Sequence, residues 1–279
     1  MFQQKQLQIL FFLTCCFLCV QTYKIKSYNL NKYTTFLHHF DCPQTTRNVS
    51  IPREFTFCVR HKKMYHQIKN NRWTGIFIGT PKTNGSRIGI EFGYWRYVPW
   101  LGLSSPSKTG MSWVGPGREF DFNMLTWRHT CITFSLEDGS VVMFENGRLA
   151  GENKFDEFVS FGKAVPDFVA TLINVGCVER WQESHSGVVT DFQLFGRVLT
   201  HQELEKWTGC KDRLLGDLVS WDSENWFFNK TGNGSRIEYL EFEHDVCDLR
   251  NMSHHFFPGK RSFQKSLELC KKISGKLNE

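Results

Sequence analysis

The chain has 279 residues, and its 41% hydrophobic and 22% charged residues exclude a disordered or collagen-like protein. The formal net charge of +6 is small and scattered, which argues against a dedicated nucleic-acid-binding protein. Ten cysteines and 26 phenylalanines are more than a typical domain of this size needs. The length allows one large domain or two modest ones.

The first 22 residues are typical of a secretory signal peptide. Lys5 precedes an apolar run over 9–20 that is too short to span a bilayer, and polar residues follow. We expect cleavage near Thr22, with an uncleaved membrane anchor as the alternative. No later segment is apolar enough for a transmembrane helix, so the sequence predicts a secreted or lumenal protein.

Cysteines and sequons agree with that compartment. Three of the ten cysteines lie in the signal segment, which leaves seven, an odd number, so at least one lacks a partner within the chain. None of these seven cysteines forms a CxxC pair, so the spacing indicates neither a zinc ribbon nor thioredoxin-like redox chemistry. Sequons for N-glycosylation predict surface positions. These sequons begin at Asn48, Asn84, Asn229, Asn233 and Asn251.

Short β-prone runs separated by turn residues dominate the region from Ile51 to Trp207. Asn146-Gly147 is the residue pair best suited to a tight hairpin turn, and long helical periodicity is missing. The pattern predicts an all-β fold, an antiparallel two-sheet sandwich or jelly roll. Strands are expected near 55–59, 75–79, 88–92, 131–134, 141–144 and 188–194.

One short helix is expected close to the last of these strands. Thr200 and Glu203 have the spacing of a capping box, in which each side chain satisfies the other residue's backbone N–H. Leu204 and Trp207 would face the sandwich, and Gly209 would end the helix.

The flanking regions differ from this sandwich. We interpret 23–50 as an N-terminal extension, 51–217 as the sandwich domain and 218–255 as a glycosylated connector. The stretch 256–279 contains apolar residues at helical spacing, which predicts an isolated C-terminal helix. Since such a helix is marginal alone, it is interpreted as the opening of a further domain.

Residues 127–135, Trp-Arg-His-Thr-Cys-Ile-Thr-Phe-Ser, resemble the pentraxin signature His-x-Cys-x-Ser/Thr-Trp-x-Ser. Segments 55–60 and 187–195 also resemble strands of pentraxin and laminin-G-like domains. The match spans roughly 51–207 and implies a concanavalin A-like jelly roll.

The resemblance implies a disulfide between Cys58 and Cys131. Cys177 and Cys210 are a second expected pair, because both flank the closing strand and helix. The partners of Cys42, Cys247 and Cys270 stay open.

Pentraxins hold calcium with an Asp-Asn pair in an early loop and a later Glu-Gln-Asp cluster. The segment that matches the early loop, 80–87, has no carboxylate. In the later segment, 174–180, Glu179 is the one remaining candidate ligand. Calcium prefers six to eight oxygen ligands with several carboxylates, so we expect no cofactor, with calcium at Glu179 as the alternative.

The C-terminal residues carry a second resemblance. The pattern Phe263-x-x-Ser266-x-x-x-Cys270-x-x-Ile273-Ser274-Gly275-x-Leu277 resembles the first helix of a C-type lectin domain. It implies a truncated start of such a domain in 256–279, with the partner of Cys270 beyond the chain.

Catalysis is not expected. Glu119 and Asp121 alternate like the acids of jelly-roll glycosidases, but Asn123 replaces the third carboxylate, and no Gly-x-Ser-x-Gly elbow occurs.

Aromatic residues with arginine are favoured at contact sites, and they gather over 92–100 and near 181. Packing into the sandwich is the alternative for these side chains. The candidate ligand contacts are Trp95, Arg96, Tyr97, Trp100 and Trp181.

The function we expect is a secreted, non-catalytic recognition module that binds extracellular glycans or proteins through sandwich loops. One alternative is an extracellular fragment of a larger receptor or adhesion protein in which the domain is a spacer. A degenerate jelly-roll glycosidase is the alternative from another class. The sequence fixes neither the ligand nor the oligomeric state.

Overall fold

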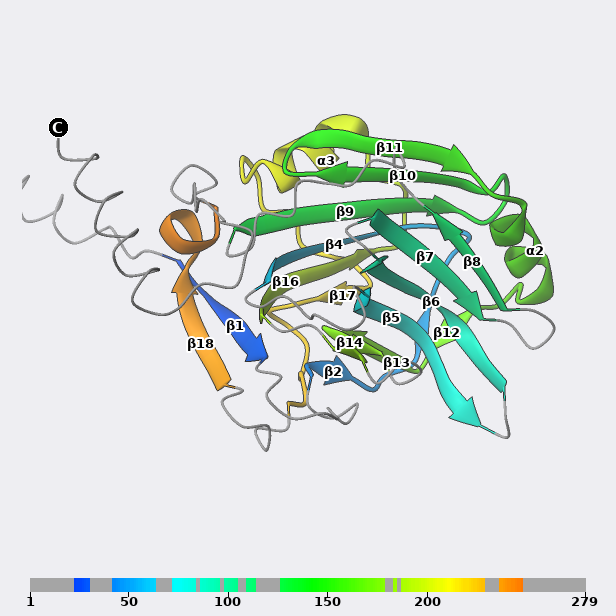
Figure 1. Cartoon of the computed structure of the whole chain (residues 1–279), viewed down its shortest axis with the longest axis horizontal. Coiled ribbons are helices and arrows are strands. Elements are labelled where there is room, and N and C mark those ends of the chain that lie inside the picture. Colours follow the sequence, from blue (N-terminus) through cyan, green and yellow to red (C-terminus); the bar gives the residue numbers. More distant parts are fainter. Residues whose placement is uncertain are drawn as a thin grey trace, which may run out of the picture.

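Two antiparallel sheets packed face to face form the body of the protein, as the computed structural model of the chain shows (Figure 1). No helix in the described part of the chain is long and apolar enough to cross a membrane. The expected all-β, concanavalin A-like sandwich is confirmed. The structure describes residues 23–30, 42–63, 72–83, 86–95, 98–104, 109–113, 126–178, 183–184, 187–228 and 236–247.

The larger sheet has eight strands, and two of its central strands, β9 and β16, are buried along their whole length. Both faces of these strands are therefore covered, one by the second sheet and one by helix α3 and the segments around it. The order is β11 (Arg148–Lys154), β10 (Ser140–Glu145), β9 (Trp127–Ser135), β4 (Glu54–Lys63), β16 (Gly187–Phe195), β1 (Lys24–Leu30) and β18 (Arg236–Glu241), with β17 (Val219–Ser220) beside β16.

The second sheet has six strands, and two short strand pairs accompany it. The order is β2 (Gln44–Thr45), β13 (Leu172–Val175), β5 (Arg72–Thr83), β6 (Ser86–Trp95), β7 (Val98–Ser104) and β8 (Thr109–Trp113). The pairs are β12 (Val169–Ala170) with β3 (Val49–Ser50), and β14 (Cys177–Val178) with β15 (Glu183–Ser184).

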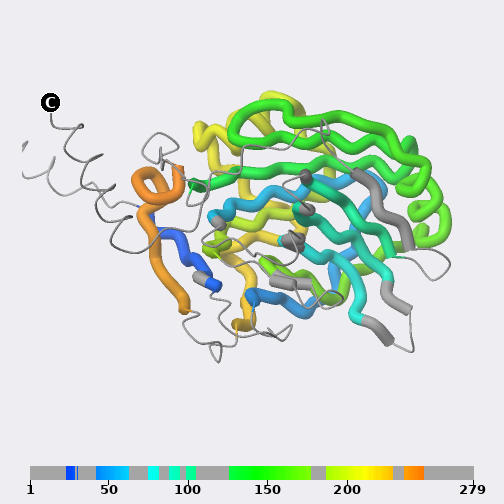
Figure 2. The backbone as a smooth tube through the Cα atoms, in the orientation of Figure 1, coloured from blue at the N-terminus to red at the C-terminus, as the bar shows by residue number. Residues whose placement is uncertain are grey.

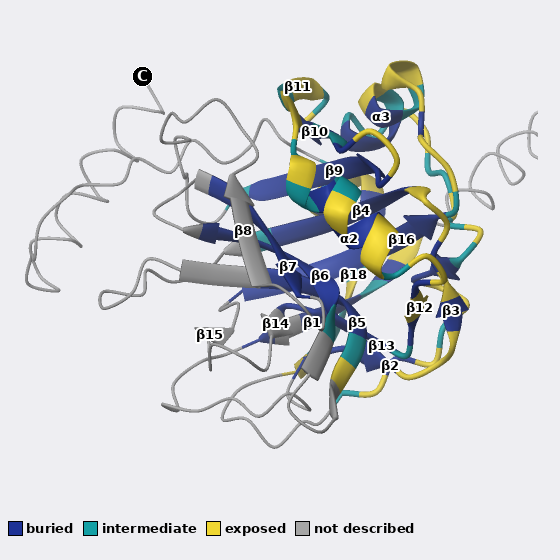
Figure 3. Ribbon diagram, turned by 90° about the vertical axis from the view of Figure 1, so that its right-hand side faces the viewer, coloured by how far each residue is buried: buried dark blue, intermediate teal, exposed yellow. Residues whose placement is uncertain are grey.

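Phenylalanines fill the space between the two sheets. Phe55 and Phe134 stack on neighbouring strands with ring centroids 4.7 Å apart. Phe57 reaches across to Phe92 of the other sheet at 5.7 Å. Figure 3 shows these strands buried and the helices exposed on their outer sides. The high phenylalanine content is thus used largely for the core.

Two local predictions are confirmed. Asn146 and Gly147 have φ angles of 50° and 77° in the turn between β10 and β11, which is the left-handed conformation that this pair tolerates. Helix α3 (His201–Thr208) begins with the expected capping box between Thr200 and Glu203. Its apolar side covers the outer face of the large sheet.

Helix α2 (Asp156–Ala164) was not expected from the sequence. Acidic residues Asp156 and Glu157 occupy its first turn and Lys163 its last, as the helix dipole favours. Phe158 and Phe161 are buried against the core. Nine residues give too few turns for a clear period, which explains why the pattern escaped notice.

The large sheet includes strands from both sides of the region 51–217. β1 lies in the presumed extension 23–50 and β18 in the presumed connector 218–255, yet the two pair with each other and extend the large sheet. Figure 2 shows them side by side, β1 in blue and β18 in orange. β18 is a half-exposed edge strand, so its sequence lacks the alternation that marks a buried strand. The C-terminal helix and the C-type lectin resemblance lie outside the described residues.

The disulfides confirm one expected pair and correct the other. Cys58 and Cys131 are register partners on β4 and β9 and are bonded. Cys210 is bonded to Cys247, and not to Cys177. Pairing of β18 with β1 brings Cys247, at the end of the single π-helical turn η3 (Phe242–Val246), to the end of α3. Cys42 is disulfide-bonded as well.

Candidate functional site

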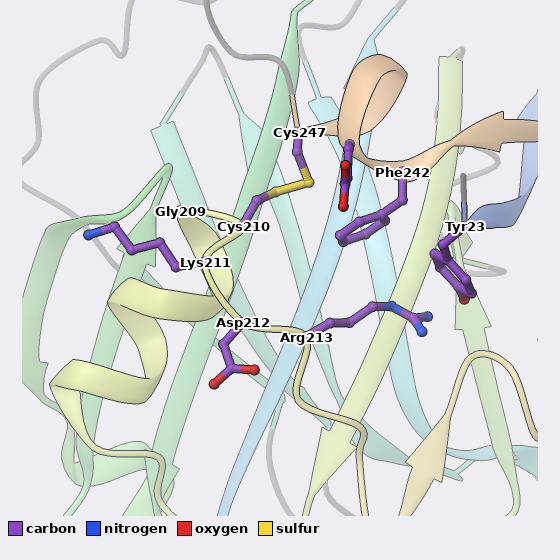
Figure 4. Close-up of a pocket in the computed structure, with 9 residues that line it drawn as sticks. Tyr23, Gly209, Cys210, Lys211, Asp212, Arg213, Phe242 and Cys247 are labelled. Carbon is purple, nitrogen blue, oxygen red and sulfur yellow. A yellow bond between two sulfur atoms is a disulfide. The ribbon is translucent and has the colours of Figure 1, made fainter. Parts of the chain in front are cut away.

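An open pocket of about 630 Å³ lies where the end of α3, the start of β1 and the turn η3 meet (Figure 4). Its walls come from segments almost at opposite ends of the described chain, and the Cys210–Cys247 disulfide forms part of one wall. The lining residues are Tyr23, Gly209, Cys210, Lys211, Asp212, Arg213, Phe242, Glu243 and Cys247.

The pocket combines aromatic rings with both signs of charge. Tyr23 is 43% exposed, whereas Phe242 is 8% exposed and packs edge-on against it at 5.8 Å. Lys211, Asp212 and Glu243 are exposed. With Arg213, the lining holds two cations and two carboxylates, so its formal charges cancel. Such a lining offers hydrogen-bond donors and acceptors without a strong electrostatic preference for ions.

Arg213 and Tyr23 are held in place by carboxylates at the edge of the pocket. Arg213 Nη2 lies 3.0 Å from Asp191 Oδ1 and 2.6 Å from Asp222 Oδ2. The Tyr23 hydroxyl donates to Asp222 Oδ1 at 3.0 Å. Burial raises the pKa of Tyr23 above its ordinary value, and Asp222 adds to that effect while Arg213 opposes it. The exposed ring therefore has a fixed position in the wall.

Beneath the pocket, a fully buried ion pair lies on the outer face of the large sheet. Arg60 Nε donates to Asp191 Oδ2 at 2.8 Å, and both side chains are inaccessible to solvent. The other nitrogens of Arg60 donate to the Trp207 carbonyl and to Cys210 Sγ, each at 2.9 Å. The guanidinium also lies 3.9 Å from the Trp207 ring centroid. Every donor group of this arginine thus has a partner, as a buried charge requires.

In this ion pair, burial and the opposite charge shift each residue's pKa in opposite directions. Burial lowers the pKa of Arg60 below its ordinary value, and Asp191 counteracts that effect. For Asp191, burial alone would raise the pKa, but Arg60 and Arg213 lower it below its ordinary value. The carboxylate is therefore charged at neutral pH.

Backbone geometry places Asp191 in this network. The pairing of β16 with β4 shifts register between Thr190 and Gln193, and Asp191 has a φ of 50°. Gln193 Nε2 donates to Asp191 Oδ1 at 2.8 Å. Sequence reasoning missed this residue, although an aspartate, the one charged residue of an expected strand, was a usable signal.

His129 sits beside Arg60, its register partner, and is also fully buried. Its Nδ1 lies 2.7 Å from the Thr208 carbonyl and its Nε2 lies 2.9 Å from the Val246 carbonyl. Burial, helped by Arg60, lowers the pKa of His129 to about 3, so the ring is neutral at pH 7. A neutral imidazole has one N–H, so the ring donates to one of these two carbonyls while it packs between the end of α3 and the turn η3.

The outer face of the six-stranded sheet contains the one predicted ligand contact whose side chain is described. Trp100 is 3% exposed, which contradicts the expectation of an exposed contact loop at this residue. It follows the alternative, packing against the sheet over Gly102. Its Nε1 has no hydrogen-bond partner among the described residues, and neither amide atom of buried Asn174, on the same face of the sheet, has one there.

Most of the other predicted site residues lie outside the part of the chain that the structure describes. The side chains of Trp95, Arg96, Tyr97 and Trp181, and the calcium candidate Glu179, lie outside the described residues. So do Glu119 and Asp121 of the glycosidase alternative and the sequons at Asn84, Asn229, Asn233 and Asn251. Asn48 is exposed, as a glycosylation site requires, but its modification stays a prediction.

Among the described residues, no group of three or more His, Cys, Asp or Glu side chains is arranged to hold a metal ion.

A second buried cluster lies at the inner face of the large sheet and connects the two sheets. Arg128 Nη1 and the Tyr94 hydroxyl both donate to Glu145 Oε1, at 2.6 and 3.0 Å. This cluster joins β9 and β10 to β6 across the core.

Comparisons with known proteins establish the fold. No family model and no curated protein matches the sequence. A SAP-like heptameric pentraxin from Limulus polyphemus has a similar structure, with a TM-score of 0.58 and 17% identity over 80% of this chain and 97% of that chain. The extracellular region of zebrafish Gpr126/Adgrg6 matches with a TM-score of 0.54 and 13% identity, over 77% of this chain and 27% of that chain.

Proposed function

We propose that the protein is a secreted, non-catalytic recognition module that binds neutral glycans in the pocket between Tyr23 and Glu243. The observation that carries the proposal is the lining of this pocket. A fixed, partly exposed aromatic ring stands beside donors and acceptors whose charges cancel. Sugar rings present apolar C–H faces to aromatic rings, and their hydroxyls both donate and accept hydrogen bonds.

The charge balance argues for a neutral ligand over a polyanion. Arg213 is already paired with two carboxylates, and Lys211 lies 3.5 Å from Glu205. Arg213 is therefore already neutralised by its partners, and the charge of Lys211 is partly offset by an exposed carboxylate. The exposed carboxylates Asp212 and Glu243 would repel a polyanion and accept from hydroxyls.

Secretion is supported by the predicted signal peptide and by the cysteine pairing. Disulfides persist in oxidising compartments, and both the Cys58–Cys131 and Cys210–Cys247 bonds are present. The pentraxin-like and laminin-G-like fold supports a recognition role, because this architecture presents its contacts on a rigid sandwich. Protein ligands remain the alternative partner class, and a spacer role in a larger receptor or adhesion protein remains the alternative function.

The absence of catalysis and of a bound calcium ion is part of the proposal. The pocket offers Asp212 and Glu243 as carboxylates, but both side chains are exposed to solvent, and an exposed carboxylate lacks the water-excluding surroundings of a glycosidase acid. The calcium ligand set that the pentraxin resemblance implies is largely replaced in the sequence. Glycan binding should therefore persist in a calcium chelator.

The test uses the mature chain from residue 23 onward, expressed through a secretory host, on an array of neutral and sulfated glycans. Affinity for the best neutral glycan is then measured by calorimetry for the wild type and for the pocket variant Asp212→Asn/Glu243→Gln. We expect the pocket variant to lose at least about tenfold in affinity, which corresponds to roughly 1.4 kcal/mol. The matched control, Glu137→Gln/Asp167→Asn, changes two exposed carboxylates elsewhere and should bind like the wild type.

Two results would contradict the proposal. If the protein bound only sulfated glycans, the inference that the balanced charges of the pocket select a neutral ligand would be wrong. Loss of binding in Asn174→Ala, with the pocket variant unaffected, would move the site to the outer face of the six-stranded sheet, where that amide finds no partner in the described part of the chain.

A further inference from the structure

The disulfide in the pocket wall differs from the disulfide under α3. Cys58 and Cys131 are fully buried in an apolar cluster with Leu204 and Trp207. Cys210 and Cys247 are both partly exposed and line the open pocket. In Figure 4 the sulfur–sulfur bond lies across one side of that pocket. A small thiol in solution can therefore reach the second bond but not the first.

The two sulfur atoms of this disulfide have different surroundings. Cys210 Sγ accepts a hydrogen bond from Arg60 Nη1 at 2.9 Å and lies 3.6 Å from His129 Nδ1. No described residue makes a corresponding contact with Cys247 Sγ. A cation that donates to sulfur stabilises a thiolate, so Cys210 is the better leaving group of the pair.

We propose that Cys210–Cys247 is a redox-labile cystine, cleaved by thiol–disulfide exchange with a small dithiol that enters the pocket and attacks Cys247. The attacking thiolate forms a bond to Cys247 Sγ, the Cys210–Cys247 bond breaks, and its electron pair passes to Cys210 Sγ. The second thiol of the reductant then displaces Cys247, so the reductant is oxidised to its own disulfide and the protein gains two thiols.

The resulting thiolate needs no rearrangement to be stabilised. Arg60 is held by Asp191 and by the Trp207 carbonyl, so its Nη1 already points at Cys210 Sγ. The other charged groups packed around it, Asp191 and Arg213, are paired with each other as well as with their own partners. The site is therefore preorganised for the reduced form as well as the oxidised one.

Cleavage would loosen one wall of the pocket. Without the cross-link, η3 is retained by the pairing of β18 with β1, by packing of Phe242 at 4.9 Å from the Arg60 guanidinium, and by the contact of Val246 with His129. The inference concerns the reactivity of the disulfide and does not depend on what the pocket binds.

The test is made on the mature wild-type chain under native conditions. Timed exposure to dithiothreitol, followed by alkylation and peptide mapping, gives the rate at which each disulfide opens. We expect Cys210–Cys247 to open at least about tenfold faster than Cys58–Cys131. Equal rates, or faster opening of Cys58–Cys131, would overturn the proposal.

A monothiol identifies the sulfur that is attacked. Glutathione, added in excess and trapped by acid, should be found on Cys247, with Cys210 as the free thiol. Glutathione found on Cys210 would overturn the assignment of the leaving group. This measurement needs no variant, so it decides the question even if changes at Arg60 prevent folding.

A variant of Arg60 shows whether this residue, and not only the solvent exposure of the disulfide, sets the rate at which Cys210–Cys247 opens. Arg60→Lys keeps a cation near Asp191 but loses the nitrogen that donates to Cys210 Sγ. We expect several-fold slower opening of Cys210–Cys247 and loss of the preference for Cys247, with Cys58–Cys131 still protected as evidence of folding. An unchanged rate and preference in this variant would refute the role of Arg60.

Discussion

The two faces of the eight-stranded sheet are stabilised in different ways. The inner face packs phenylalanines such as Phe57 and Phe134 against the second sheet, with no charge near the centre of that contact. The outer face packs Leu204 and Trp207 of α3 over a disulfide at one place and buries Arg60 with Asp191 at another. Both faces exclude water, but the inner face keeps its one described ion pair, Arg128 with Glu145, at the strand ends, whereas the outer face buries Arg60 and Asp191 with no exposure of either side chain.

This difference determines how each face should respond to mutation. An apolar contact loses stability in proportion to the atoms removed and the cavity left. A buried ion pair contributes little net stability, because desolvation offsets attraction, but removal of one partner leaves an uncompensated charge. The pocket lies above the buried ion pair, where hydrogen bonds and ion pairs fix the positions of the side chains.

The largest effects should come from single truncations, one on each face. Asp191→Ala leaves Arg60 buried beside Arg213 without its carboxylate, so we expect a loss of about 3–5 kcal/mol in the free energy of unfolding. Phe57→Ala should cost about the same amount, through transfer and cavity terms. Denaturant unfolding followed by tryptophan fluorescence measures both.

A double variant distinguishes the two faces. Arg60→Met combined with Asp191→Leu removes both charges and keeps most of the volume, so the loss should be clearly smaller than that of Asp191→Ala alone. A double variant as unstable as the single one would show that the ion pair itself contributes the stability.

Acidification should weaken the outer face first. His129 has its pKa lowered from 6.5 to about 3 by burial, so the unfolded chain binds the proton more readily as the pH falls. The stability that this histidine contributes is complete above pH 6.5 and declines toward pH 3. At pH 4 the free energy of unfolding should have fallen by on the order of 3 kcal/mol from this residue. Asp191, with its lowered pKa, acts in the same direction.

The variant His129→Asn isolates the histidine contribution. Thermal unfolding between pH 7 and pH 4 should show a shallower decline for this variant than for the wild type. Parallel curves for the two proteins would mean that His129 does not titrate differently in the folded and unfolded states.

The smallest predicted effect concerns the start of α3. Thr200→Ala removes the hydroxyl that accepts from the Glu203 N–H, so a loss of about 1 kcal/mol is expected. Thr200→Ser, which keeps the hydroxyl, is the matched control and should remain close to the wild type. Chemical denaturation detects a difference of this size, and equal stability of Thr200→Ala would show that the cap is unimportant.

Structural features that depend on neighbouring residues were predicted correctly from the sequence. The hairpin turn at Asn146-Gly147 and the capping box at Thr200 depend on residues within a few positions of one another, and both are present. Alternating short strands were enough for the all-β class, and the pentraxin resemblance gave the Cys58–Cys131 bond between register partners.

Long-range pairing was decided only by the tertiary structure. β1 and β18 come from opposite ends of the described chain, and the edge position of β18 leaves no clear alternation to identify it. That pairing brings Cys247 to Cys210 and Phe242 to Tyr23, which creates the pocket. The sequence by itself determined the sandwich and its aromatic core, because those depend on patterns within single strands. The buried network of Arg60, Asp191 and Arg213 depends on a bulge and on three distant segments meeting, so only the folded chain could reveal it.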